Sequence, residues 1–275
     1  MLDLFQMLKS YKAVNHRIEP MPKSRRLVAG IAEAGRNKNI IQALIEADIT
    51  EFMAWRARAA ERGGQKYSTT AYVSSCLAKL VGEQPELQAY KSTFGSHLII
   101  FEDVDIVFTV ERMIEGKLMP MIYTVRNCNN KSVGELDEAL KGKKTEQIEG
   151  TKRWAIATWM MNKPWLIRRF FWFLLLHNPY LMRSYTGTVA VTSITPMVHK
   201  GFFGGGFPLS PMTLTLTVGG ISQKAVRVKN EWVQRDVIVL TLGVDHDVVD
   251  GAPLARLSKK LSRAIANPKA IIGYE

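Results

Sequence analysis

The sequence predicts an α/β domain in which helices pack on a β-sheet. Residues 237–244 are apolar at nearly every position, which is typical of a strand buried on both faces in the middle of a sheet. Directly after it, leucine and isoleucine recur at helical spacing from residue 254 to residue 265, which predicts an amphipathic helix. Strand-like and helix-like stretches alternate along most of the 275 residues, and a chain of this length can bury a sizeable core.

A histidine and an aspartate stand where this strand gives way to this helix. His246 follows the end of the apolar run, so its imidazole is expected at a strand end that meets solvent or a cleft. Gly251 and Pro253 break the strand, and proline suits the first turn of a helix. Asp250 therefore lies at or just before a helix N-terminus, where the dipole favours a carboxylate. This arrangement can orient a general base.

The N-terminal third of the chain predicts mainly helices. Gly63 and Gly64 follow one helical stretch and end it, and Ser68 is of the residue type that caps the N-terminus of the next. The expected elements are a short helix with an extended lead-in over residues 1–20, a helix over 21–34, a strand over 40–49, and helices over 50–62 and 68–84.

The middle of the chain predicts three strands and a capped helix. Glu102 and Asp103 form the turn between the first two strands. Ser132 and Glu135 have the spacing of a capping box, in which each side chain accepts a hydrogen bond from the other residue's backbone. The charged residues 141–152 then predict a flexible connection. The strands are expected over residues 98–101, 104–110 and 118–125, and the helix over residues 132–140.

The C-terminal part predicts strands joined by glycine-rich turns. Residues 186–194 predict a strand that ends in hydroxyl side chains. The Gly-Phe-Phe-Gly-Gly-Gly stretch at residues 201–206 predicts a flexible loop, and it lacks the strand–loop–helix context of a phosphate cradle. A strand is expected over residues 212–218, turned by Gly219 and Gly220. Residues 224–228 and 233–242 then predict a hairpin around residues 229–231.

The block His246-x-x-x-Asp250-Gly251, with Asp245 before it and Ala-Pro-Leu-Ala-Arg after it, resembles the CoA-dependent acyltransferases. This superfamily contains chloramphenicol acetyltransferase and the catalytic domains of dihydrolipoamide acyltransferases. The order of elements from about residue 21 resembles the second group, so we divide the chain into a lead-in, residues 1–20, and a catalytic domain, residues 21–275. The resemblance implies a chloramphenicol acetyltransferase-like mixed sheet packed with helices, and a trimer with active sites between subunits.

The chemistry implied by the resemblance is acyl transfer between thiols. A free thiol has a pKa near ~8.5, and an imidazole, with a pKa near ~6.5, is mostly neutral at cytoplasmic pH and can take the thiol proton. His246 is implied as this general base. The hydroxyl that stabilises the oxyanion falls on Thr192, or on Ser193 as the second choice. In a trimer, Thr192 of a neighbouring chain would meet His246.

Further residues follow from the same resemblance. Asp250 is implied as a structural residue that fixes the active-site turn through an ion pair with Arg25 or Arg26. Ser210-Pro211-Met212 replaces the usual Pro-Pro-Gln of the family, which alters the expected contacts to the acyl group or lipoyl arm. The predicted catalytic residues are His246, Asp250 and Thr192, and the predicted substrate-binding residues are Ser193, Gly251 and Arg26.

The expected partners follow from what the resemblance includes. Coenzyme A is implied as a substrate. No lipoyl or subunit-binding domain is recognised before residue 21, so the acyl group is expected on coenzyme A, on a separate lipoyl carrier protein or on another thioester. No metal site is expected, because the other histidines are scattered at positions 16, 97, 177 and 199.

The cysteine content and the N-terminal residues indicate the cellular compartment. Cys76 and Cys128 are the only cysteines, which implies no disulfide framework and favours a reducing cytoplasm. The N-terminus lacks a basic start followed by a long apolar core, so a signal peptide is not expected. We find no recognition motif for nucleic acid.

Charge and aromatic residues gather in one region. No acidic residue occurs between Glu149 and Glu231, an interval with ten lysines or arginines, so this region should attract anions. Within it, residues 154–183 are rich in Trp, Phe, Leu and Arg. A helix buried in the core or at a subunit interface, a helix docked on anionic lipid, and a docking site for another protein stay open. Rival functions are a catalytically inactive trimeric scaffold and a membrane-surface protein.

Overall fold

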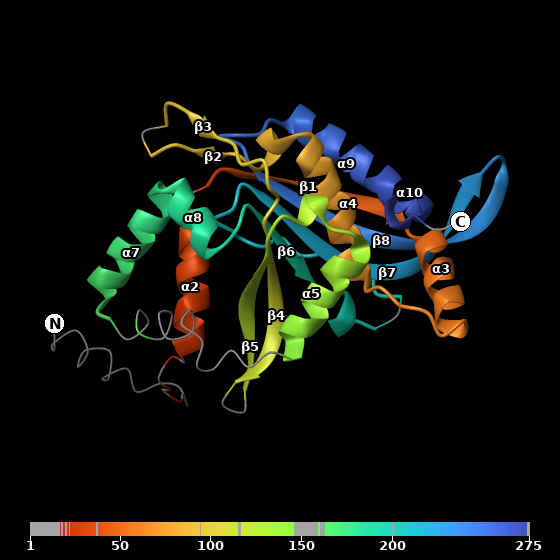
Figure 1. Ribbon diagram of the computed structural model, residues 1–275, viewed down its shortest axis with the longest axis horizontal. Helices are drawn as coiled ribbons and strands as arrows, with labels where there is room; N and C mark the ends of the chain where they lie inside the picture. Colours follow the sequence, from red (N-terminus) through yellow and green to blue (C-terminus); the bar gives the residue numbers. More distant parts are fainter. Residues whose placement is uncertain are drawn as a thin grey trace.

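The computed structural model of the protein describes residues 23–273 apart from residues 37, 94, 115–116, 146–158, 160–162 and 200, together with residues 17, 19 and 21. Within these ranges a six-stranded sheet carries helices on both faces (Figure 1). The predicted lead-in, residues 1–20, lies outside the described residues except for Arg17 and Glu19.

The sheet is mixed, as predicted. Its strand order is β1-β8-β7-β6-β4-β5. β6 runs parallel to both of its neighbours, and the other pairs are antiparallel. A separate two-stranded sheet joins β2 (Tyr90–Lys91) and β3 (Leu98–Ile99), so the strand predicted over residues 98–101 is shorter than expected. The six strands are β1 (Ile40–Asp48), β4 (Ile106–Ile114), β5 (Lys117–Val125), β6 (Val189–Ser193), β7 (Leu214–Val228) and β8 (Glu231–Asp245).

One face of the sheet holds the main hydrophobic core. Leu240 and Leu242 of β8 point to this face and are fully buried, as are Leu257 and Leu261 of the helix that follows. Each such side chain contributes about 1.5–3 kcal/mol to stability. The central strand and the amphipathic helix predicted from the sequence are therefore confirmed. The helices of this core are α3 (Thr50–Glu61), α4 (Thr69–Glu83), α5 (Val133–Thr145), α9 (Gly251–Ile265) and α10 (Pro268–Ile272).

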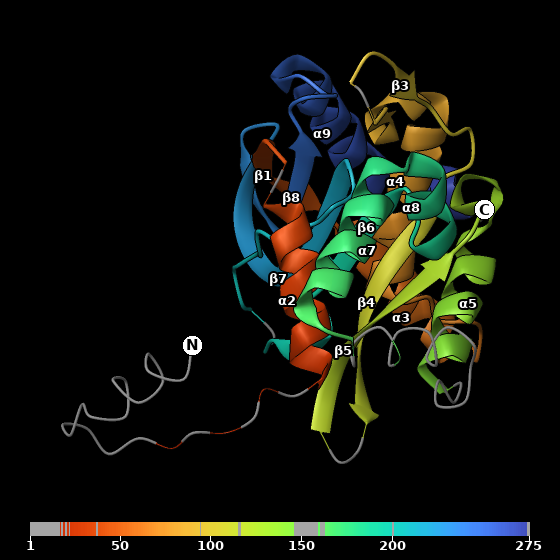
Figure 2. The ribbon, with the colours of Figure 1, turned by 90° about the vertical axis from the view of Figure 1, so that its left-hand side faces the viewer.

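The opposite face carries a second, smaller layer. α2 (Lys23–Gly35) and α7 (Trp165–His177) lie side by side in front of the sheet (Figure 2), and α8 (Pro179–Tyr185) follows α7. Leu175 of α7 and Met182 of α8 pack in one cluster with Val107 of β4 and with Met212, which precedes β7. None of the helices in the described part of the chain has the length and apolarity needed to cross a lipid bilayer.

Two predicted helix starts are confirmed atom by atom. The Ser68 hydroxyl accepts a hydrogen bond from the backbone N–H of Ala71 at 3.2 Å, which caps α4. Ser132 and Glu135 form the predicted capping box, because each side chain accepts from the other residue's N–H. α5 then continues to Thr145, so residues 141–145 are helical and not the flexible connection that we expected. Three short 3-10 helices are also described: η1 (Pro85–Gln88), η2 (Cys128–Asn130) and η3 (Thr195–Met197).

The prediction that Gly219 and Gly220 turn the chain is wrong. β7 runs straight through them as one strand, with a bulge between Val218 and Ile221. The glycines are needed because the predicted 201–206 loop passes over them: a Cβ at Gly220 would lie 2.1 Å from the carbonyl oxygen of Phe202. The turn comes later, at Lys229 and Asn230, whose φ angles of 47° and 70° are those of the primed turns that connect hairpins.

We therefore predict that Gly220→Ala destabilises the protein by about 1–3 kcal/mol, because the new methyl group must displace backbone. Gly142→Ala is the matched control. A Cβ there meets nothing within 4 Å in α5, so alanine should stabilise the helix by up to about 1 kcal/mol. Urea unfolding of both variants measures the difference. Equal stability of wild type and Gly220→Ala would contradict the close approach of the loop.

Candidate active site

His246 lies where β8 ends, as predicted. Asp245 is the last strand residue, and its carbonyl oxygen accepts the N–H groups of Val248 and Val249, which turns the chain away from the sheet. The N–H of His246 donates to the carbonyl oxygen of Asn39 at 2.7 Å. The side chain of His246 is 46% exposed. A backbone hydrogen bond from outside the motif thus fixes this turn while the imidazole stays accessible.

The imidazole faces an open pocket of about 610 Å³. The residues before and at the start of β1 form one wall, and the turn that carries His246 forms the other. The pocket is lined by Lys38, Asn39, Ile40, Ile41, His246 and Asp247. It therefore places lysine, amide, isoleucine and carboxylate side chains around an accessible imidazole.

A buried ion pair supports this turn from below. Lys38 Nζ lies 2.5 Å from a carboxylate oxygen of Asp245, and the two side chains are 16% and 5% exposed. The other carboxylate oxygen of Asp245 accepts the N–H of Asp247 at 3.2 Å. A charge removed from water to this extent persists only with a well-placed partner. The residue before His246 is therefore locked to the segment before β1.

The residue after His246 is held in the same way. The carboxylate of Asp247 accepts a hydrogen bond from the Asn39 side chain at 2.8 Å and pairs with Lys91 of β2. The hydrogen bond from Lys91, followed by that from Asn39, lowers the pKa of Asp247, and the hydrogen bond to Asp247 raises the pKa of Lys91. Each aspartate beside His246 thus has its own lysine, which reduces the negative potential at the imidazole.

Asp250 is the N-cap residue of α9, also as predicted. Its side chain is 82% exposed and its Oδ1 lies 3.6 Å from His246 Nδ1, too far for a hydrogen bond. Arg25 is exposed and forms no ion pair with Asp250, and the side chain of Arg26 lies outside the described residues. The pairing with Arg26 therefore stays a prediction. Gly251 is the first residue of α9, and a Cβ at this position would meet nothing within 4 Å.

Thr192 and His246 do not meet within one chain. Thr192, near the end of β6, pairs with Thr217 of β7, and Thr217 pairs with Thr241 of β8. His246 follows Thr241 by five positions, which is about 17 Å along the strand, and two strand spacings add about 10 Å sideways. The half-buried Thr192 hydroxyl has no hydrogen-bond partner among the described residues. Ser193 donates to the Thr195 hydroxyl at 3.4 Å.

The sequence did not reveal the residues that hold the turn. Lys38 and Asn39 come more than 200 positions before their partners, and no local pattern links segments so far apart. The two aspartates that flank His246, Asp245 and Asp247, were the available signals. Burial raises the pKa of both cysteine thiols to about 12, so neither cysteine is a ready nucleophile. Within the described ranges, no three His, Cys, Asp or Glu side chains gather as metal ligands.

Part of the chain matches the model of a known protein family. Residues 187–272 match the family model of the 2-oxoacid dehydrogenases acyltransferase (catalytic domain), a range that includes Thr192, His246 and Asp250. The predicted resemblance to the dihydrolipoamide acyltransferases is confirmed. The dihydrolipoamide acetyltransferase structure of Azotobacter vinelandii has the same fold, with a TM-score of 0.70 and 22% identity over 95% of this chain and 96% of that chain.

Two longer relatives of this acyltransferase-like chain are dihydrolipoyllysine-residue acetyltransferase components of pyruvate dehydrogenase complexes. The Azotobacter vinelandii protein is 26% identical over 261 residues, and the Pseudomonas aeruginosa protein is 24% identical over 261 residues. Each match covers 93% of this chain, which spans 36% of the first relative and 42% of the second. The similarity therefore concerns one part of those proteins.

We predict that Lys38→Met destabilises the protein by about 3–5 kcal/mol, because it leaves the carboxylate of Asp245 buried without a partner. Adding Asp245→Asn should restore much of this loss. The control is Lys260→Met, which removes an exposed partner 4.0 Å from Glu83 and should cost less than about 1 kcal/mol. Chemical denaturation measures all of them. A double variant no more stable than Lys38→Met would contradict the ion pair.

Proposed function

We propose that this protein is a CoA-dependent acyltransferase with His246 as its general base. The observation that carries the proposal is the accessible imidazole at the end of β8, beside an open pocket and in a turn fixed by Asn39. The match of residues 187–272 to an acyltransferase catalytic domain supports it, as do relatives named as acetyltransferases.

In the proposed reaction a thiol approaches His246 in the pocket and gives its proton to the neutral imidazole. The sulfur then forms a bond to the carbonyl carbon of an acyl thioester, and the carbonyl oxygen takes the negative charge. When the oxyanion collapses, the bond to the original sulfur breaks. The departing thiolate recovers the proton from the imidazolium, which restores the base. The net result is exchange of an acyl group between two thiols.

We propose Thr192 of a neighbouring protomer as the oxyanion donor. Its hydroxyl makes no hydrogen bond among the described residues, so it is available to an incoming oxyanion. The strand register keeps it far from His246 of its own chain, which favours a site shared between protomers of a homotrimer. One such donor typically accounts for ~10²–10³ in turnover.

The Azotobacter structure belongs to a study of a serine, a histidine and an asparagine in the catalytic mechanism of that enzyme. There the asparagine follows the histidine by four positions, the spacing of His246 and Asp250 here. The serine precedes the histidine by nearly the same number of positions as Thr192 does here. These spacings support the proposed roles, with a carboxylate at 250 in place of an amide.

We propose acyl-CoA as the donor and a dihydrolipoamide-type thiol on a separate carrier, or another small acceptor, as the second substrate. Ser193, Gly251 and Arg26 remain our candidates for substrate contacts. Ser210-Pro211-Met212 is the segment where the acceptor site should differ from that of the family. We further propose that the reaction takes place in the cytoplasm.

We predict that His246→Ala lowers the rate of thiol release from a panel of acyl-CoAs by at least ~10²-fold, because the thiol loses its base. His199→Ala is the matched control: His199 is also exposed, but it stacks edge-on against Phe202, away from the pocket. Its rate should stay within about twofold of wild type. Equal rates in His246→Ala and wild type would remove the catalytic role of His246. If neither exceeded the uncatalysed rate, the result would favour an inactive scaffold.

A further inference from the structure

The outer face of α7 is apolar and uncovered. Six of its side chains are large, hydrophobic and more than 40% exposed, with Leu166 at 63% and Phe170 at 61%. Of the alternatives left open for this segment, burial of this face in the core of its own chain is therefore wrong, and burial at a subunit interface is not tested by a single chain. We call these residues the α7 face: Trp165, Leu166, Ile167, Phe170, Phe173 and Leu174.

Packing on the other side prevents α7 from turning this face inward. Phe171, Trp172 and Leu175 pack into the smaller hydrophobic cluster. Gly30 of α2 lies directly beneath the indole, since a Cβ there would be 2.7 Å from Trp172 Nε1. Rotating the helix would expose these side chains instead, with no gain in buried area.

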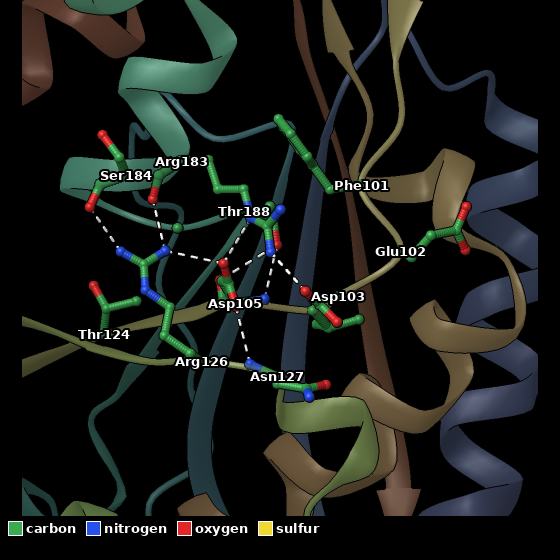
Figure 3. A network of polar contacts seen from close by, with 12 residues as sticks. Phe101, Glu102, Asp103, Asp105, Thr124, Arg126, Asn127, Arg183, Ser184 and Thr188 are labelled. Atoms are coloured by element: carbon green, nitrogen blue, oxygen red, sulfur yellow. Dashed lines mark hydrogen bonds and ion pairs between the residues drawn. The ribbon is translucent and has the colours of Figure 1, made fainter.

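A buried charge network anchors α8, the neighbour of α7 in sequence. Arg183 of α8 and Arg126 each donate to the carboxylate of Asp105 at 2.9 Å (Figure 3). Asp105 is 1% exposed, so its charge requires these partners. Arg183 also donates to Asp103 and lies over the ring of Phe101. The α7–α8 unit is thus fixed to the sheet with its apolar face outward.

The surroundings of the α7 face are basic. Arg169 lies within the face, and Lys163 lies two residues before α7 begins. The chain has no acidic residue between Glu149 and Glu231. Among the described residues, Glu33 of α2 pairs with Arg169 at 3.8 Å, and both side chains are more than 70% exposed. Such an exposed pair is weak, so the positive potential persists.

We propose that the α7 face docks on an anionic lipid surface. Apolar and aromatic side chains on one face of a helix with basic residues around them are the pattern of helices that lie in the membrane interface, and tryptophan prefers that depth. Thirteen residues give a helix about 20 Å long that lies in the plane of the surface. A two-fold contact between two copies fits less well, because it would bring Arg169 of one copy near Arg169 of the other. A head-to-tail contact within the proposed trimer is an outcome of the test below.

Vesicle flotation of the full-length protein tests this proposal. The wild type should bind vesicles of phosphatidylcholine with 30% phosphatidylglycerol at least about tenfold more tightly than phosphatidylcholine alone, and 0.5 M salt should weaken the binding. Phe170→Ser/Phe173→Ser should lose at least about tenfold in affinity, and Arg169→Gln about fivefold. Circular dichroism confirms that each variant is folded.

Trp232→Ser is the matched control. Trp232 is even more exposed, at 73%, but it lies in the β7–β8 hairpin, at the far side of the molecule from α7 (Figure 1), so this variant should bind like the wild type. Absence of vesicle binding, or equal binding by the double phenylalanine variant, would overturn the proposal. So would a change of oligomeric state in the double variant without vesicle binding by the wild type, which would assign the face to contacts between copies.

Discussion

The pairing of β8 with both β1 and β7 is the constraint on which the rest of the structure depends. It gives one face of β8 to the helices of the main core, and it brings the end of β8 beside the residues that precede β1. It also fixes the register through which Thr192 stands far from His246. The same hydrogen bonds therefore build the core, expose the candidate base and keep Thr192 away from it within a single chain.

Paired charges complete what the sheet begins. Lys38 and Lys91 form ion pairs with the aspartates on either side of His246. On the other face of the sheet, the ion pairs of Asp105 with two arginines hold α8 in place. In both places, the ion pairs join the end of a strand to a segment that is distant in the sequence. The buried carboxylates of Asp245 and Asp105 penalise any arrangement that breaks their pairs, so these pairs help to specify the geometry of the turn and of α8.

Local patterns were enough to predict most of the elements and the position of His246. The apolar run of β8, the leucine spacing of α9 and the cap residues Ser68 and Ser132 act over a few positions, and the structure agrees with each. The errors come from distant contacts. Gly219 and Gly220 leave room for the loop of residues 201–206, and the sequence next to these glycines does not indicate that contact. Lys38 and Asn39 lie outside the motif that they support, and the pattern of α7 could not tell which face would stay uncovered.

The central claim is that His246 of one chain and Thr192 of another form one site. Mixed oligomers test it most directly: His246→Ala and Thr192→Val chains, each inactive alone, are unfolded together and refolded at equal amounts. A shared site predicts recovery of about a quarter of wild-type activity, because random assembly joins an intact His246 to an intact Thr192 at one interface in four. A mixture no more active than its separate components would contradict the account.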